Sequence, residues 1–124
     1  MKQQRPVNLD LTKFKWPLAA ITSILHRISG VLVFFGIALL LYLLDLSLQS
    51  EAGFQRVAEL LSSPTLKLIT WVVLSALLYH LVAGVKHLIM DFGIGETISG
   101  ARAGAVTTLV LAAVAIVIAG VWIW

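Results

Sequence analysis

Three long apolar stretches limit what this chain of 124 residues can fold into. Ile28–Leu44 and Ala103–Trp124 contain no charged residue, and Leu68–Val85 is interrupted only by His80. A helix needs about 20 mostly apolar residues to cross the hydrocarbon core of a bilayer. Hydrophobic residues make up 60% of the chain, whereas soluble domains have roughly 45–50%. The sequence therefore predicts an integral membrane protein.

The pattern favours an all-α fold in which residues 1–124 form a single membrane-anchor domain. Three transmembrane helices are expected, at about 18–47, 64–90 and 103–124. Pro17 suits the first turn of the first helix, because proline lacks the N–H that would be unpaired there. The pair Ser63-Pro64 supplies a cap and a first-turn residue for the second helix.

Residues 50–62 have the pattern of a short amphipathic helix that lies on the outer membrane surface. Its apolar side chains share one face, and polar side chains surround them. The apolar group consists of Phe54, Val57, Ala58 and Leu61, and the polar group of Glu51, Gln55, Arg56 and Glu59. We interpret this segment as structural.

The positions of the charges predict how the chain crosses the membrane. Basic residues gather in the arm formed by residues 1–16 and around the second loop, beside Lys86 and Arg102. Cytoplasmic segments carry the excess of Lys and Arg, so the N-terminus is expected in the cytoplasm and the C-terminus outside. The basic arm acts as a topology determinant or as a docking surface for a partner subunit. The net charge of +3 is attributed to this topology, and we expect membrane lipid as a partner and no nucleic acid.

Several classes of chemistry and targeting are excluded or disfavoured. The chain has no cysteine, so disulfides, iron–sulfur ligation and thiol chemistry on this chain are excluded. A cleavable signal peptide is not expected, because the first apolar run carries His26 and Arg27 and no small-residue cleavage pattern. No transit peptide rich in Arg and Ser precedes Pro6, which favours a bacterial inner membrane over a mitochondrial one.

The second apolar stretch carries a line of residues suited to chemistry. His80, Gly84 and His87 fall on one face of a helix, with the two imidazoles about 10 Å apart. An ionisable side chain inside a membrane marks a functional site by default. Asp91 is placed to accept a hydrogen bond from His87 or to pair with Lys86.

A second cluster occupies the start of the first helix. It consists of Ser23, His26, Arg27, Ser29 and Gly30. Helical spacing allows the hydroxyl, imidazole and guanidinium groups to converge on one groove. Arg27 lies roughly 15 Å along the axis from Pro17, although its long side chain can also snorkel back toward the headgroups.

Both clusters belong to the cytoplasmic ends of antiparallel helices, so His26-Arg27 and Lys86-His87 are expected at similar heights, with His80 deeper. A pocket with an imidazole at its floor and cations at its mouth suits haem, whose iron takes an axial histidine and whose propionates want cations. Gly30 and Gly84 would leave room for a macrocycle or a close helix contact. Two alternatives stay open: a packed histidine bonded to a neighbouring carbonyl or hydroxyl, and a proton relay.

These residues resemble the signatures of a known family, the larger cytochrome b membrane anchor of succinate dehydrogenase. The first signature is carried by Arg5-Pro6-Val7, Leu11, Leu18 and the run Ser23–Ser29, and the second by His80, Gly84–Leu88 and Met90–Gly93. One departure is visible, because the family usually has Arg where this chain has Lys86. Lysine keeps the charge but loses the bidentate fork of arginine.

The resemblance implies a role in respiratory complex II, in which a flavoprotein and an iron–sulfur protein pass electrons to two membrane anchors. It implies haem b shared with the second membrane anchor, and ubiquinone as substrate. By similarity, His80 is an axial haem ligand, the rim near the propionates comprises His26, Arg27, Lys86 and His87, and the quinone pocket includes Ser23, Ile24 and Arg27. Ser29, Gly30, Gly84 and Asp91 are candidates for supporting contacts around these groups.

The chain alone is not expected to be catalytic, because the resemblance places the substrate chemistry on other subunits. The sequence is also compatible with two other functions. One is a proton-conducting or transporter subunit with His80 and His87 as a relay, and the other is an inert anchor that seats soluble subunits. The related fumarate reductase anchors share the fold and run the reaction in the opposite direction.

Overall fold

The apolar segments and the short surface segment all form helices. The computed structural model describes residues 17–124, in which the elements are α1 (Leu18–Gln49), α2 (Glu51–Ser62), α3 (Pro64–Asp91) and α4 (Ile98–Ile123). The predicted basic arm, residues 1–16, lies outside the described residues. Helices α1, α3 and α4 are long and apolar enough to cross a membrane. This confirms the predicted all-α fold with three transmembrane helices, while the orientation of the termini stays a prediction.

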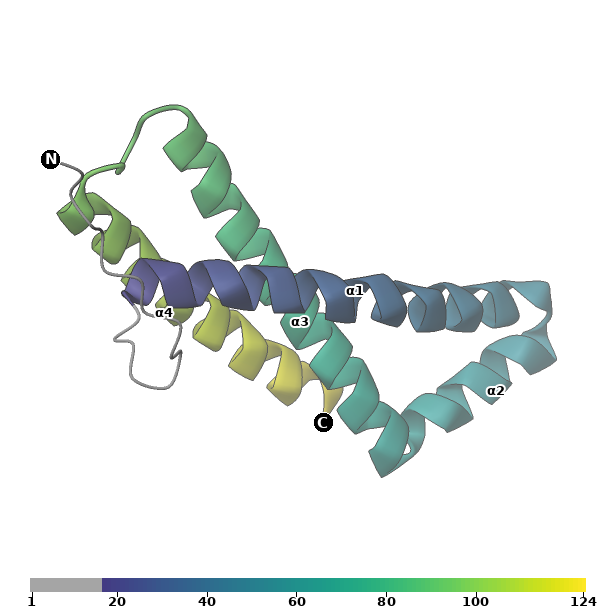
Figure 1. The fold of residues 1–124 in the computed structure, drawn as a ribbon. Coiled ribbons are helices and arrows are strands. Elements are labelled where there is room, and N and C mark those ends of the chain that lie inside the picture. Colours follow the sequence, from purple (N-terminus) through teal and green to yellow (C-terminus); the bar gives the residue numbers. More distant parts are fainter. Residues whose placement is uncertain (1–16) are drawn as a thin grey trace, which may run out of the picture.

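Helix α3 is the centre of the arrangement. It packs along α4 on one side and against α1 on the other. Figure 1 shows α1 crossing α3 at a wide angle, while α2 runs from the far end of α1 to the start of α3 and closes a triangle. Segments that are far apart in the sequence are thereby brought together where α1 and α3 cross.

The predicted start of the third transmembrane helix is wrong, because α4 begins at Ile98 and not at residue 103. In the sequence, Gly100 and Arg102 are typical of the end of a loop, which suggests a helix that begins after them. In the structure Thr97 caps the helix, since its hydroxyl accepts a hydrogen bond from the backbone N–H of Gly100 at 3.0 Å. The connecting turn is correspondingly short and contains Gly93 and Gly95, with φ of 82° and 74°, a left-handed conformation that glycine tolerates well.

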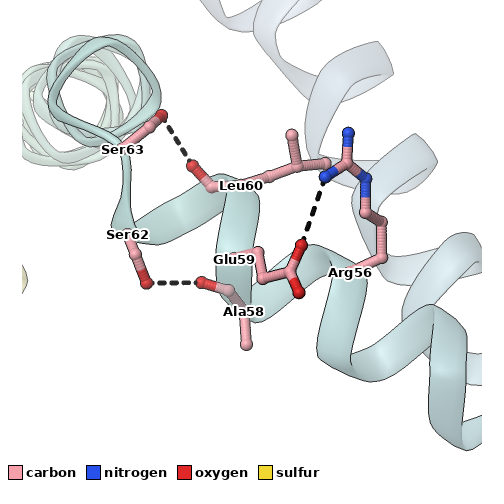
Figure 2. A network of polar contacts seen from close by, with 6 residues as sticks. All are labelled: Arg56, Ala58, Glu59, Leu60, Ser62 and Ser63. Atoms are coloured by element: carbon pink, nitrogen blue, oxygen red, sulfur yellow. Dashed lines mark hydrogen bonds and ion pairs between the residues drawn. The ribbon is translucent and has the colours of Figure 1, made fainter.

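Hydroxyl groups set both ends of the surface helix α2. Ser50 caps its start by accepting a hydrogen bond from the N–H of Gly53 at 2.9 Å. At its other end the hydroxyls of Ser62 and Ser63 donate to the carbonyls of Ala58 and Leu60 at 2.7 and 2.8 Å (Figure 2). The backbone N–H of Ser63 also donates to the Leu60 carbonyl at 3.1 Å, so two donors of one residue stabilise the bend between α2 and α3.

The apolar side of α2 is only partly buried within this chain. Val57 is buried, but Phe54 is 58% exposed within this chain. On the polar side Arg56 donates to Glu59 at 3.2 Å (Figure 2), an exposed pair that contributes little to stability.

Small residues allow α3 and α4 to pack closely. Ala105 and Ala112 are buried at this contact. The indole N–H of Trp71 on α3 donates to the carbonyl of Ile116 on α4 at 3.0 Å, and the ring lies over Gly120. Lipid tails are as apolar as leucine, so close approach and interhelical hydrogen bonds stabilise such contacts.

Gly36 marks a close approach of α1 to α3. It is buried, and a Cβ atom at this position would lie 2.6 Å from Cγ1 of Val73. Any larger side chain must therefore push the two helices apart.

We predict that Gly36→Val lowers the melting temperature of the purified protein in mild detergent, because overpacking a close contact costs about 1–3 kcal/mol. Ala38→Val is the matched control, since Ala38 lies on the exposed side of the same helix. Equal melting temperatures for the two variants would contradict the close approach at Gly36.

Candidate functional site

Three histidines meet where α1 and α3 cross. His26 comes from α1, and His80 and His87 come from α3. The rings of His26 and His80 stack with centroids 4.2 Å apart and planes 7° apart. The ring of His87 is tilted by 53° from that of His26, at a centroid distance of 5.1 Å. The two sequence clusters therefore form one site, with His26 between the two imidazoles of α3.

His80 is held against α1 through one ring nitrogen. Its Nδ1 lies 3.1 Å from the hydroxyl oxygen of Ser29 and 3.2 Å from the carbonyl oxygen of His26. The Ser29 hydroxyl donates to the same carbonyl at 2.7 Å, and Ser29 is only 5% exposed. In the part of the chain that the structure describes, no hydrogen bond is formed by Nε2 of His80.

Two glycines give the imidazoles their space. A Cβ atom on Gly30 would lie 3.1 Å from Cε1 of His80, and one on Gly84 would lie 3.6 Å from Nε2 of His26. The first distance is shorter than a normal van der Waals contact, so the His80 ring fits here because residue 30 has no side chain. At Gly84 the room is less restricted.

Lys86 and Tyr79 converge on a residue that sequence reasoning missed. Thr22 on α1 is fully buried. Its hydroxyl oxygen accepts a hydrogen bond from Nζ of Lys86 at 3.3 Å, and its carbonyl accepts one from the hydroxyl of Tyr79 at 2.8 Å. The methylenes of Lys86 pass beside Gly104 of α4. Lys86 therefore braces three helices, and Thr22 could have been found from its position one turn before His26.

The other predicted site residues form no hydrogen bond with this cluster among the described residues. Arg27, Ile24 and Asp91 are exposed within the chain, and Ser23 is half-buried. Within residues 17–124 the structure shows no hydrogen bond that joins any of them to the three histidines, and Asp91 forms no ion pair with Lys86. The expected convergence of Ser23 and Arg27 with His26 is therefore absent from the described contacts.

Two apolar cavities flank the cluster. One, of about 400 Å³, lies between α1 and α3 and is lined in part by Ser29, Tyr79 and Ala76. The other, of about 500 Å³, lies between α3 and α4 near their connecting turn, with Lys86 in its wall. No group of three or more metal-binding side chains is present among residues 17–124, so a metal ion would need ligands from elsewhere.

The fold defines a membrane-anchor protein with three apolar spans. Its polar site is a histidine cluster that lies where two of the spans cross. A model of the succinate dehydrogenase/fumarate reductase transmembrane subunit family matches residues 1–119. The chain belongs to this family, as the sequence resemblance indicated. It is accordingly a multi-pass protein of the inner membrane.

Named relatives from bacteria and from a mitochondrion support the family assignment. The succinate dehydrogenase cytochrome b556 subunit of Coxiella burnetii is 48% identical over the full length of both chains. The subunit of the same name from Paracoccus denitrificans is 37% identical over 79% of this chain and 75% of its own. The mitochondrial cytochrome b560 subunit of Mus musculus is 34% identical over 87% of this chain and 65% of its own.

We predict that Tyr79→Phe lowers the stability of the purified protein by about 1 kcal/mol, the typical net value of a buried hydrogen bond. The variant removes the hydroxyl that joins α3 to the Thr22 carbonyl. Tyr42→Phe is the control, because Tyr42 is 62% exposed. Thermal melting in detergent measures both, and a Tyr79→Phe protein as stable as the control would refute the predicted contribution.

Proposed function

We propose that this chain is the anchor subunit that binds haem b in a succinate:quinone oxidoreductase, with His80 as an axial ligand of the iron. The observation that carries the proposal is the arrangement of His80: Nδ1 is engaged by α1, and Nε2 has no partner among the described residues. A metal-ligating histidine typically bonds its other ring nitrogen to a protein oxygen in this way. Cytochrome b in the names of the relatives agrees with haem b.

The rest of the cluster fits the same group. A porphyrin supplies four ligands of its own, so this chain needs to provide only one, and the second axial ligand is proposed to come from the second membrane anchor of the complex. His26 and His87 lie beside His80 on the side of the α3–α4 turn. Together with Arg27 and Lys86 they supply the positive or hydrogen-bonding groups that propionates require. Because Lys86 is bonded to Thr22, its contribution is to the local charge.

When bound, the haem supplies one-electron transfer within the membrane, and the protein supplies its position and electrostatics. The residues of this chain would hold the haem in place and set the electrostatics around it. His26 covers one face of the His80 imidazole, and buried Ser29 and Thr22 close the helix contact behind it.

The quinone site is proposed on the face of α1 that is exposed within this chain. Ile24 and Arg27 are exposed there, and Ser23 is half-buried on the same turns. An exposed guanidinium can donate hydrogen bonds to a quinone carbonyl and stabilise the negative charge that develops on its oxygen. The iron–sulfur protein is proposed to cover this side, with the flavoprotein beyond it. The relatives are named as succinate dehydrogenase subunits, which favours succinate oxidation. We propose ubiquinone as the electron acceptor.

The geometry gives less support to a proton relay. A relay needs hydrogen bonds in line between the rings, but His26 and His80 meet face to face. No hydrogen bond joins two imidazoles in the described part of the chain. The inert-anchor alternative accounts for the bonds of Nδ1 as helix packing, but it gives no role to Nε2, which has no partner among the described residues.

We predict that His80→Ala abolishes the sharp b-type bands in a reduced-minus-oxidised spectrum of the complex purified with this chain in mild detergent. The reason is the loss of the proposed iron ligand. His87→Ala is the control and should retain the bands, since His87 packs at an angle against His26 and is not bonded at Ser29. A flat spectrum from the intact wild-type complex would remove haem from the proposal. Loss of the bands in His87→Ala but not in His80→Ala would assign the iron ligand to His87 in place of His80.

We predict that Arg27→Ala lowers quinone reduction by roughly tenfold or more, because a hydrogen bond to a charged group is worth about 1.5–3 kcal/mol. Assembly of the complex should change less, because the Arg27 side chain is exposed and does not hold the helices of this chain together. The matched control is Arg102→Ala, which removes an exposed arginine from the start of α4. Unchanged turnover and quinone affinity in Arg27→Ala would reject the assignment.

A further inference from the structure

We propose that Ser29 is a positioning residue that, together with the His26 carbonyl, fixes the tautomer of His80, keeping the proton on Nδ1 and the lone pair on Nε2. This inference rests on the proposed haem function and adds a residue whose role can be measured separately. It follows from the hydrogen-bond balance among three atoms where α1 crosses α3: Nδ1 of His80, Oγ of Ser29 and the carbonyl oxygen of His26.

The first step concerns where the hydroxyl proton goes. The Ser29 oxygen lies 2.7 Å from the carbonyl of His26 and 3.1 Å from Nδ1 of His80. A carbonyl oxygen can only accept, so the shorter contact requires the hydroxyl to donate to it. The serine oxygen then presents only lone pairs to the imidazole.

The second step concerns the imidazole. Nδ1 faces two acceptors, the Ser29 oxygen at 3.1 Å and the His26 carbonyl at 3.2 Å. An unprotonated Nδ1 would put its own lone pair against that carbonyl, whereas a protonated Nδ1 donates to both oxygens. The carbonyl also belongs to the hydrogen-bond ladder of α1 and already accepts from Ser29. Ser29 is therefore the acceptor with spare capacity, and neutral His80 carries its proton on Nδ1.

The third step concerns rigidity. The ring of His80 is confined by the His26 ring at 4.2 Å on one face and by Gly30, where a Cβ atom would lie 3.1 Å from Cε1. Ser29 itself is 5% exposed, so water cannot easily replace its hydroxyl. The hydrogen bond thus fixes both which nitrogen is free and the direction in which it points.

The hydrogen bond between His80 and Ser29 should affect the reduction potential of the haem, which simple packing against His80 would not do. A hydrogen bond to the far nitrogen of a ligating imidazole raises the basicity of the ligand. A more basic ligand favours ferric over ferrous iron, which lowers the reduction potential. Loss of the hydroxyl should therefore raise the potential of the haem while the iron ligand itself remains.

The test is a potentiometric titration of the b-type bands in the whole complex purified in mild detergent, comparing wild type with Ser29→Ala. Supporting interactions around a metal typically contribute 10–100-fold. We expect the ferric preference to fall about tenfold, which raises the midpoint potential by about 59 mV for one electron. Ser29→Thr keeps the hydroxyl and should return the potential toward the wild-type value.

Ser75→Ala is the matched control. Ser75 lies on the same helix as His80 and lines the same cavity as Ser29. Its hydroxyl, however, donates to the Trp71 carbonyl at 2.6 Å within α3. Its removal should leave the potential unchanged even if stability falls.

The outcomes separate this inference from the haem assignment. An unchanged potential in Ser29→Ala, or an equal shift in Ser75→Ala, overturns the role of Ser29 and leaves haem binding in place. A lowered potential in Ser29→Ala overturns it as well. A wild-type complex without b-type bands refutes the proposed function itself.

Discussion

The contact between α1 and α3 is the interaction on which the rest of the structure depends. In a bilayer no hydrophobic driving force holds one apolar helix against another, so small residues and interhelical polar bonds decide where helices meet. Here the contact combines the close approach at Gly36 with the bonds from Tyr79 to Thr22 and from His80 to Ser29. The same bonds that define the crossing also orient the imidazole, so the helix contact and the proposed ligand site depend on each other.

Sequence reasoning could predict the helices because their causes are local. The length of each apolar stretch and the Ser63-Pro64 signal set the positions of α1 and α3 within two residues of the observed ends. The start of α4 was missed because Gly100 and Arg102 suggested a loop, whereas the capping hydroxyl of Thr97 carries the helix through both. A single side-chain cap outweighed the weak helix preference of glycine.

The site was predictable in part, for a different reason. Helical spacing placed His80 and His87 on one face, and antiparallel helices brought His26 to them. Thr22 lies one turn before His26 on the same face of α1, so spacing could have included it in the site. Spacing along one helix does not show, however, that Lys86 of α3 contacts it. Ser23 and Arg27 were grouped with His26 on the same basis. They lie on turns of α1 that the chain leaves accessible, where a partner subunit is proposed to supply what they contact.

The contacts of Lys86 determine which other residue can bind an anionic group at this end of the site. Its stem passes beside Gly104 of α4 and its ammonium group reaches buried Thr22 on α1. A compact ammonium suits this narrow path, whereas the planar guanidinium that the sequence resemblance leads one to expect here would need room for a fork of five donors. Because the ammonium is committed to Thr22, bidentate recognition of an anionic group at this end of the site must come from another residue. Arg27 is the guanidinium available nearby on α1, and its exposed side chain can serve either a propionate or a quinone, but one fork cannot make full bidentate contact with both at once.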